Sequence, residues 1–106
     1  LQSGVPTAAE PFTPPVACRL EAFPNPFNPA ITLRIEIGAA GPVRLAVFDI
    51  GGRLVRTLAS HPLEGGRHTF HWTGLNAAGR EAPSGIYLAR LVSAGETASA
   101  KLVLVR

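Results

Sequence analysis

Residues 31–37 read Ile-Thr-Leu-Arg-Ile-Glu-Ile, with an apolar side chain at every second position. Because successive side chains of an extended strand point to opposite faces, this alternation predicts a half-buried β-strand. The same period of two returns in residues 43–47 and in residues 67–72. No stretch of the chain shows a convincing helical period, so the pattern predicts an all-β fold.

Working outward from residues 31–37, we expect seven short strands. They are residues 17–22, 31–37, 43–47, 54–58, 67–72, 86–92 and 97–105. The segments between them carry glycine and proline: Gly38–Pro42, Gly51-Gly52, Gly65-Gly66, Gly74–Gly85 and Ala94-Gly95. Asp49 stands where its carboxylate can accept bonds from the amides of the Gly51-Gly52 turn. Regularly spaced short strands of this kind are typical of a β-sandwich of the immunoglobulin type.

Composition sets the class of protein. The chain has 106 residues and 46% apolar side chains, which suits one folded domain rather than a disordered segment. No run approaches the ~18 apolar residues that a membrane helix needs.

The net charge of +3 comes from scattered arginines, so no nucleic-acid patch is expected. The chain lacks methionine and an apolar leader, so we expect Leu1 to be a processing site or the start of an excised domain.

Residues 1–17 differ from the rest of the chain. They hold four prolines and no periodicity, which predicts an extended, polyproline-like linker or arm. We expect this arm to lie against its own domain, residues 18–106, or against a neighbouring chain. The second case would make a homo-oligomer possible.

A proline-rich corner follows the first expected strand: Phe23-Pro24-Asn25-Pro26-Phe27-Asn28-Pro29. Each proline fixes its own φ and keeps the preceding residue out of the helical region, so the segment is predicted to be stiff and extended. Phe23 and Phe27 are expected to be its two apolar anchors. Asn25 and Asn28 are expected to bond their own backbone in turns.

Candidate chemistry is sparse. His68 and His71 fall on opposite faces of one expected strand, and Cys18 and Asp49 are single residues of their kinds, so no metal site, cofactor or catalytic set is predicted. The lone thiol cannot form an internal disulfide and is expected to be inert. Trp72 and Tyr87 are expected to pack in the core, with the Tyr87 hydroxyl bonded to a loop carbonyl.

Several short motifs occur in a characteristic order. They are Pro24-Asn25-Pro26-Phe27-Asn28-Pro29, Val43–Asp49 with Gly52-Arg53, Trp72 with Gly74, Gly79-Arg80, Ser84-Gly85-Ile86-Tyr87, and Lys101-Leu102-Val103-Leu104-Val105-Arg106. This ordered set resembles the immunoglobulin-like domains related to the flagellar hook-cap protein. That family overlaps the C-terminal sorting domains of bacterial type IX secretion substrates.

The resemblance implies a non-enzymatic C-terminal domain of a larger secreted or cell-surface bacterial protein, exported through the periplasm and the outer membrane. It implies that the outer-membrane secretion machinery recognises the terminal strand, Lys101–Arg106, and that Arg106 lies at a natural C-terminus. We expect this recognition to add a strand at an exposed sheet edge. Relatives often carry Asp-Gly after the tryptophan; Thr73-Gly74 and Asn76 stand here, which weakens any cation site.

Three other functions also fit the sequence. A structural subunit of an extracellular filament would dock through its N-terminal arm. A hook-cap-like domain would act as a scaffold in the flagellum. An adhesion module would need exposed aromatic side chains, for which Phe12, Phe27, Phe48 and Trp72 are the candidates. In all of these the partners are proteins or glycans rather than nucleic acid.

Overall fold

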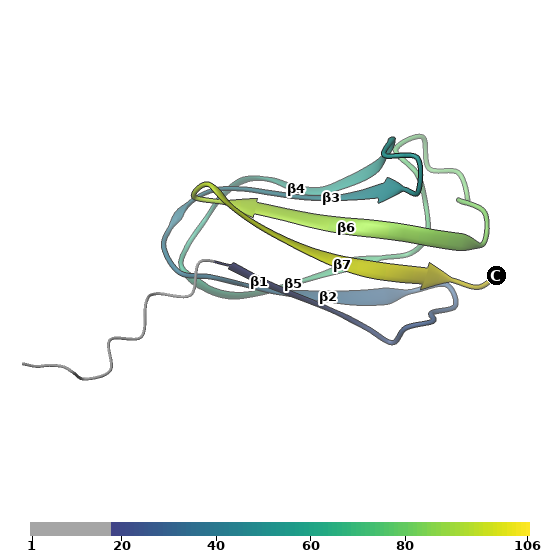
Figure 1. The fold of residues 1–106 in the computed structure, drawn as a ribbon, viewed down its shortest axis with the longest axis horizontal. Coiled ribbons are helices and arrows are strands. Elements are labelled where there is room, and N and C mark those ends of the chain that lie inside the picture. Colours follow the sequence, from purple (N-terminus) through teal and green to yellow (C-terminus); the bar gives the residue numbers. More distant parts are fainter. Residues whose placement is uncertain (1–17) are drawn as a thin grey trace, which may run out of the picture.

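The computed structural model describes residues 18–106; the predicted arm, residues 1–17, lies outside the described residues. The strands are β1 (Cys18–Phe23), β2 (Ile31–Ile37), β3 (Gly41–Asp49), β4 (Leu54–Leu63), β5 (Gly66–Trp72), β6 (Gly85–Ser93) and β7 (Glu96–Leu104). Figure 1 shows these strands running along the long axis of the molecule. The predicted all-β, seven-stranded fold is confirmed. Within the described range, no helix is long and apolar enough to cross a membrane.

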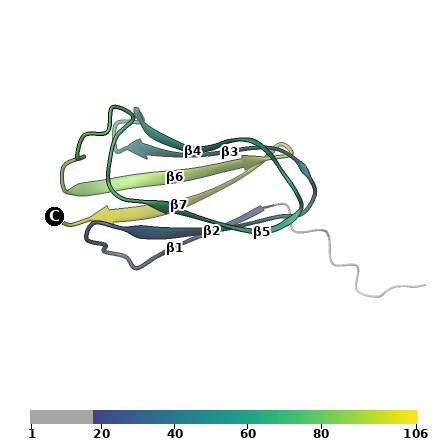
Figure 2. The ribbon, with the colours of Figure 1, turned by 180° about the vertical axis from the view of Figure 1, so that it is seen from behind.

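The strands form two antiparallel sheets. One sheet has the order β1-β2-β5, and the other has the order β4-β3-β6-β7. Figures 1 and 2 show the two sheets stacked face to face, with β7 lying above β1 and β2. The chain changes sheet after β2, β4 and β5, so neither sheet is a simple meander. This two-layer arrangement is that of an immunoglobulin-like β-sandwich.

The core lies between the sheets because alternate side chains of the strands, mostly apolar, point inward. In β2 the isoleucines and Leu33 are buried, while Arg34 is exposed. The buried side chains form two clusters. One surrounds Phe27, Trp72 and Tyr87, and the other surrounds Ile35 and Leu45. The alternation in residues 31–37 therefore predicted correctly which side chains of this strand enter the core.

Two strands are longer than expected, while the other ends agree to within one residue. β3 runs from Gly41, inside the expected turn, to Asp49, and β4 continues to Leu63 rather than ending at Leu58. The extension pairs Pro42 with Pro62, and two register shifts interrupt the β3–β4 ladder. β4 is an edge strand, where prolines and irregular pairing are tolerated, and this is why the apolar alternation ends before the strand does.

The hairpin between β6 and β7 turns at Ala94-Gly95, as expected. Ser93 pairs with Glu96 across it, and Ala94 and Gly95 have φ values of 52° and 80°. Positive φ at both central positions is what a tight two-residue hairpin requires. This turn places β7 at the edge of the four-stranded sheet, with its second half beside the proline-rich corner.

Candidate functional site: the clamp on the terminal strand

The proline-rich corner lies directly alongside β7. The backbone amide of Phe27 donates to the Val103 carbonyl at 2.9 Å, and the Val105 amide donates to the Phe27 carbonyl at 2.9 Å. Phe27 and Leu104 thereby form an isolated parallel bridge. Two segments far apart in the sequence, both of which carry family motifs, are thus joined through their backbones.

Asn25 extends this contact with its side chain. Its Nδ2 donates to the Lys101 carbonyl at 2.6 Å, and its Oδ1 accepts from the Val103 amide at 2.8 Å. The prediction that Asn25 bonds its own backbone is wrong. One amide side chain offers a donor and an acceptor side by side, which matches the outward C=O and N–H of a strand edge. We call Asn25 and Phe27 the clamp.

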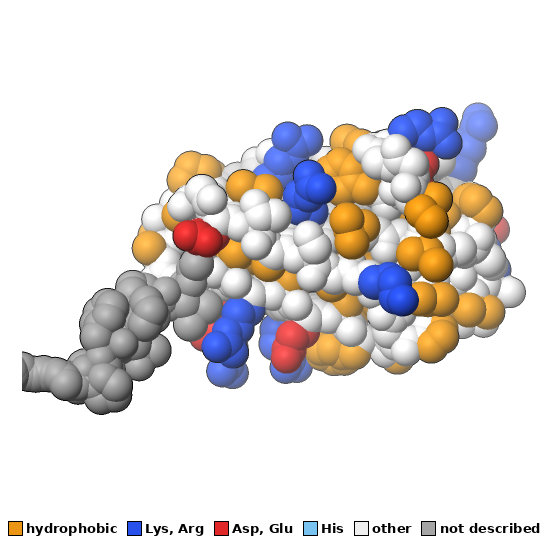
Figure 3. All heavy atoms as spheres, in the orientation of Figure 1, with side chains coloured by type: hydrophobic (Ala, Val, Ile, Leu, Met, Phe, Trp, Pro, Cys, Tyr) orange, Lys and Arg blue, Asp and Glu red, His pale blue; other side chains and the backbone are white. Residues whose placement is uncertain are grey.

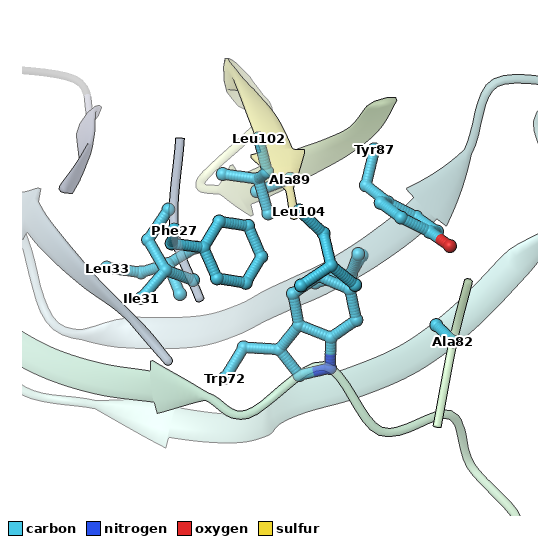
Figure 4. Close-up of a cluster of buried hydrophobic side chains, with 10 residues drawn as sticks. Phe27, Ile31, Leu33, Trp72, Ala82, Tyr87, Ala89, Leu102 and Leu104 are labelled. Atoms are coloured by element: carbon cyan, nitrogen blue, oxygen red, sulfur yellow. The ribbon is translucent and has the colours of Figure 1, made fainter. Parts of the chain in front are cut away.

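The ring of Phe27 anchors the clamp in the core. Its side chain is 2% exposed, and its ring centroid lies 5.7 Å from that of Trp72. Figure 4 shows Phe27 meeting Leu102 and Leu104 of β7 in the same cluster. A buried ring of this size contributes several kcal/mol, roughly 3–5 kcal/mol by analogy with Phe→Ala changes in cores.

The second predicted anchor of the corner, Phe23, is not one. Its side chain is 40% exposed, and the Arg34 guanidinium lies over its ring at 4.9 Å. Along β1 the alternate residues, such as Leu20 and Ala22, face the core, so the period of two turns Phe23 outward.

Trp72 and Tyr87 fasten the long connection between β5 and β6. The indole Nε1 of Trp72 donates to the Leu75 carbonyl at 2.8 Å, and the Tyr87 hydroxyl donates to the Pro83 carbonyl at 2.6 Å. Their ring centroids lie 5.3 Å apart in an edge-on arrangement. Burial raises the pKa of Tyr87, so the hydroxyl remains a donor. Trp72 and Tyr87 are buried in the core, as Phe27 is. Trp72 and Phe27 therefore offer no exposed aromatic surface to an adhesion partner.

Arg106 ties the end of the terminal segment to the same connection. Its Nε donates to the Ala82 carbonyl at 2.5 Å, and its Nη2 donates to the Gly74 carbonyl at 2.6 Å. The Arg106 amide also donates to the Ser84 hydroxyl at 2.9 Å, and Glu81 lies 3.7 Å from Nη1. We call this set of contacts the Arg106 latch.

The clamp and the latch hold the terminal segment in one orientation. Leu102 and Leu104 are buried, whereas Lys101 and Val105 are exposed and Val103 is half-buried. Because Leu102 and Leu104 point into the core, the side chains of Lys101, Val103 and Val105 are the ones that a partner can contact on this strand.

The remaining motif residues shape turns. The Asp49 Oδ1 accepts from the amides of Gly51 and Arg53, each at 2.9 Å, as predicted for a turn carboxylate. These bonds, the one from Arg53 first, hold the pKa of Asp49 below its ordinary value. Gly52 has φ 87°, in the left-handed region that favours glycine. Gly85 begins β6. Pro24, Pro26, Asn28 and Pro29 lie exposed around the clamp.

The described residues offer little for metal or redox chemistry. No three His, Cys, Asp or Glu side chains converge within residues 18–106. His68 bonds the Glu64 carbonyl at 2.7 Å, and His71 lies 3.3 Å from the Thr32 hydroxyl, so the two rings serve different neighbours. Burial, and then the carboxylate of Glu96, raises the pKa of the Cys18 thiol, which keeps it protonated and weakly nucleophilic.

The sandwich with its clamped terminal strand defines an immunoglobulin-like domain, and comparison with known proteins identifies its family. The model of the FlgD Ig-like domain matches residues 30–97. The chain belongs to this family. No curated protein sequence is a significant match.

Solved structures with the same fold include PorU, PorZ and FlgD. The chain is 26% identical to dimeric latent PorU from Porphyromonas gingivalis, with a TM-score of 0.65 over 83% of this chain and 9% of that one. PorZ from the same organism, described as an essential bacterial surface component of the type IX secretion system, is 19% identical with a TM-score of 0.59 over 82% and 11%. FlgD from P. aeruginosa is 18% identical, with a TM-score of 0.51 over 82% and 67%.

Three conclusions follow from these comparisons. The chain spans 9% of the PorU chain and 11% of the PorZ chain, so its relatives there are much longer proteins. The likeness to PorZ and FlgD shows the shared fold. The predicted membership of the hook-cap-related immunoglobulin-like family is confirmed.

Sequence reasoning singled out both partners of the clamp but did not bring them together. Asn25 and Val103 are separated by 78 positions, and no local pattern links them. The Arg106 latch was also missed as a contact, because a single arginine among scattered arginines carries no signal in the sequence.

Proposed function

We propose that residues 18–106 form a non-enzymatic sorting or anchoring domain at the C-terminal end of an exported bacterial protein. In this proposal the outer-membrane secretion machinery recognises the terminal strand, Lys101–Arg106, and the protein reaches the cell surface. PorZ, which shares the fold, is described as a surface component of the type IX secretion system, which supports this choice of pathway.

The clamp is the observation that carries the proposal. It fixes the second half of β7 on its outward edge while the core holds Leu102 and Leu104 from the inside. Lys101, Val103 and Val105 are therefore displayed in one rigid arrangement. A partner that reads a pre-organised surface does not lose binding free energy to ordering it.

The expected mode of recognition changes with this geometry. Strand addition at the edge of β7 would need the backbone groups of Lys101, Val103 and Val105, and the clamp already occupies them. We therefore propose that the machinery reads the outward side chains of the terminal strand rather than its backbone.

A secretion assay tests the proposal. A reporter cargo is fused in front of the full chain in a bacterium with a type IX system, and fractions are blotted for the cargo. Deletion of residues 101–106 should leave the cargo in the periplasm. Because that deletion also removes Leu102 and Leu104 from the core, the sharper variant is Lys101→Ala with Val105→Ala, whose side chains are exposed.

The double variant needs a matched control on the same sheet. Thr57→Ala with Ser60→Ala changes two exposed side chains of β4, at the opposite edge. Both double variants should melt within a few degrees of the parent, since exposed substitutions change stability by roughly 0.5 kcal/mol or less each. Only the variant in the terminal strand should leave the cargo in the periplasm. Normal surface display after deletion of residues 101–106 would refute the proposal.

A scaffold role like that of the flagellar hook cap is the second candidate. The family match itself favours it, because residues 30–97 include neither the corner nor the terminal segment. A scaffold built on that core should tolerate Lys101→Ala with Val105→Ala. Restoration of hook assembly by this variant in a hook-cap-deficient strain would support the scaffold role.

A further inference from the structure

The outer face of the four-stranded sheet is apolar near the end of the chain. One row of cross-strand neighbours runs Leu54, Phe48, Leu88 and Lys101 across all four strands, and Ile86 faces Val103 in the next row. Their sequence neighbours, such as Tyr87 and Leu102, are buried, so these side chains point away from the core. Figure 3 shows apolar side chains gathered over this end of the molecule with basic side chains beside them.

This outer face contains a groove, and several of its apolar side chains are exposed. A groove of about 320 Å³ lies between Phe48, Ile50, Ile86 and Leu88. Ile50 is 84% exposed and Ile86 is 46% exposed. A contiguous apolar surface rimmed by polar groups is typical of an interaction site in a folded domain.

The rim of the groove is positively charged. Arg90 and Lys101 line it, and the Arg90 guanidinium lies 5.4 Å from the centre of the Phe48 ring. Among residues 18–106, neither cation forms a salt bridge. The one acid at the groove, Asp49, is engaged by the Gly51 and Arg53 amides and by the Arg53 side chain. The groove thus presents two uncompensated cations above an apolar floor.

We propose that this groove docks an extended segment of a partner protein in which aliphatic and acidic side chains alternate. The aliphatic side chains would cover Phe48, Ile86 and Leu88, and the carboxylates would pair with Arg90 and Lys101. Complementary charge is what selects such a segment from other apolar ones. The proposal rests on the proposed function, because Lys101 belongs both to the groove and to the terminal strand.

The test uses the full chain labelled with ¹⁵N and two synthetic peptides. One short peptide alternates Glu and Leu, and a matched peptide alternates Lys and Leu. The Glu-Leu peptide should shift the amide resonances of Phe48, Leu88 and Lys101 in a saturable way, and the Lys-Leu peptide should not. Arg90→Glu with Lys101→Glu should weaken the binding by tenfold or more.

A matched charge reversal controls for net charge. Arg19→Glu with Arg67→Glu changes the same total charge on the exposed outer side of the other sheet, and binding should stay within about twofold of the parent. Equal shifts with both peptides, or none with either, would overturn the proposal. Shifts of Phe48 and Leu88 that depend on protein concentration without peptide would identify a second copy as the occupant instead.

The two proposals fail separately. If the Glu-Leu peptide binds but Lys101→Ala with Val105→Ala is still secreted normally, the groove stands and the sorting role falls. If that variant leaves the cargo in the periplasm while no peptide binds the groove, the sorting role is supported and the proposed occupant of the groove is refuted.

Discussion

The two edges of the four-stranded sheet are protected in different ways. At β7 a distant segment of the same chain occupies the edge: Asn25 and Phe27 bond Lys101, Val103 and Val105. At β4 the contact with a distant segment is shorter: the Ala77 amide donates to the Val55 carbonyl at 2.8 Å, and the Arg56 Nη1 donates to the Asn76 carbonyl at 2.9 Å. Farther along β4, Pro62 and two register shifts make the pairing irregular. Irregular pairing and proline prevent association with other strands without fixing any one shape, whereas the clamp imposes one. The proposed function places recognition at the clamped edge for this reason.

Removal of the clamp's anchor should produce the largest effect. Phe27→Ala is expected to lower the free energy of unfolding by about 3–5 kcal/mol, because a fully buried ring leaves a cavity beside Trp72 and Leu104. Urea unfolding would measure it. Phe23→Ala, at the more exposed position of the same corner, should cost only about 1 kcal/mol, because it loses partial burial and the contact with Arg34. Equal losses in the two variants would mean that the corner does not anchor the terminal strand.

The latch should come next. Arg106→Ala removes two bonds from a charged donor to the carbonyls of Gly74 and Ala82, and should cost about 2–3 kcal/mol. Gly74→Ala offers an independent way to open the latch, because an added Cβ would lie 2.7 Å from the Arg106 Nη2. Since both changes break the same contact, the double variant should lose less than the sum of the single losses. Simple additivity would show that the latch is not a shared contact.

The side-chain half of the clamp should have a smaller effect. Asn25→Ala removes two hydrogen bonds to the edge of β7 and should cost about 1–2 kcal/mol. Hydrogen exchange should quicken at the Val103 amide, which loses its acceptor, more than at the Val43 amide on β3. Asn28→Ala, an exposed amide in the same corner, is the matched control. Unchanged exchange at Val103 would contradict the clamp.

The turn that leads from β3 into β4 should show the smallest effect, and that effect should shrink in acid. The pKa of Asp49 is lowered in the folded state, so its ionised form stabilises the β3–β4 turn at neutral pH. That contribution is lost as the pH falls below the ordinary range for Asp, near 3.9, and through the folded pKa. Thermal unfolding of Asp49→Asn should therefore vary less between pH 5 and pH 2 than that of the parent. An identical acid profile would contradict this assignment.

The sequence predicted the sheets better than their edges. Alternation in residues 31–37 and around Trp72 placed strands and core faces correctly, because burial on one face enforces a period of two. Where a strand lies at an edge, as β4 does from Ala59 to Leu63, its residues need not alternate, and the prediction stopped too early. The turn at Asp49 was predicted because its bonds join near neighbours.

The clamp could not be predicted from the sequence, because its hydrogen bonds are long-range. Its bonds join Asn25 to residues more than 70 positions away, so the local reading assigned Asn25 to its own turn. Phe23 ends β1, whose period of two turns its ring outward, whereas the burial of Phe27 depends on the position of β7. Residues that act together through long-range contacts need the topology before their partners can be named.

The clamp also has a mechanical consequence. Figure 1 shows the start of β1 at one end of the sandwich and the C-terminus at the other. Tension between these two points pulls β1 and β7 in opposite directions along their own axes. Ladder hydrogen bonds lie perpendicular to the strands, so such a load shears many bonds at once instead of opening them one by one. The bonds of Asn25 and Phe27 to β7 lie in the path of that load. A domain that tethers a cargo would resist extension most strongly where its terminal strand is clamped.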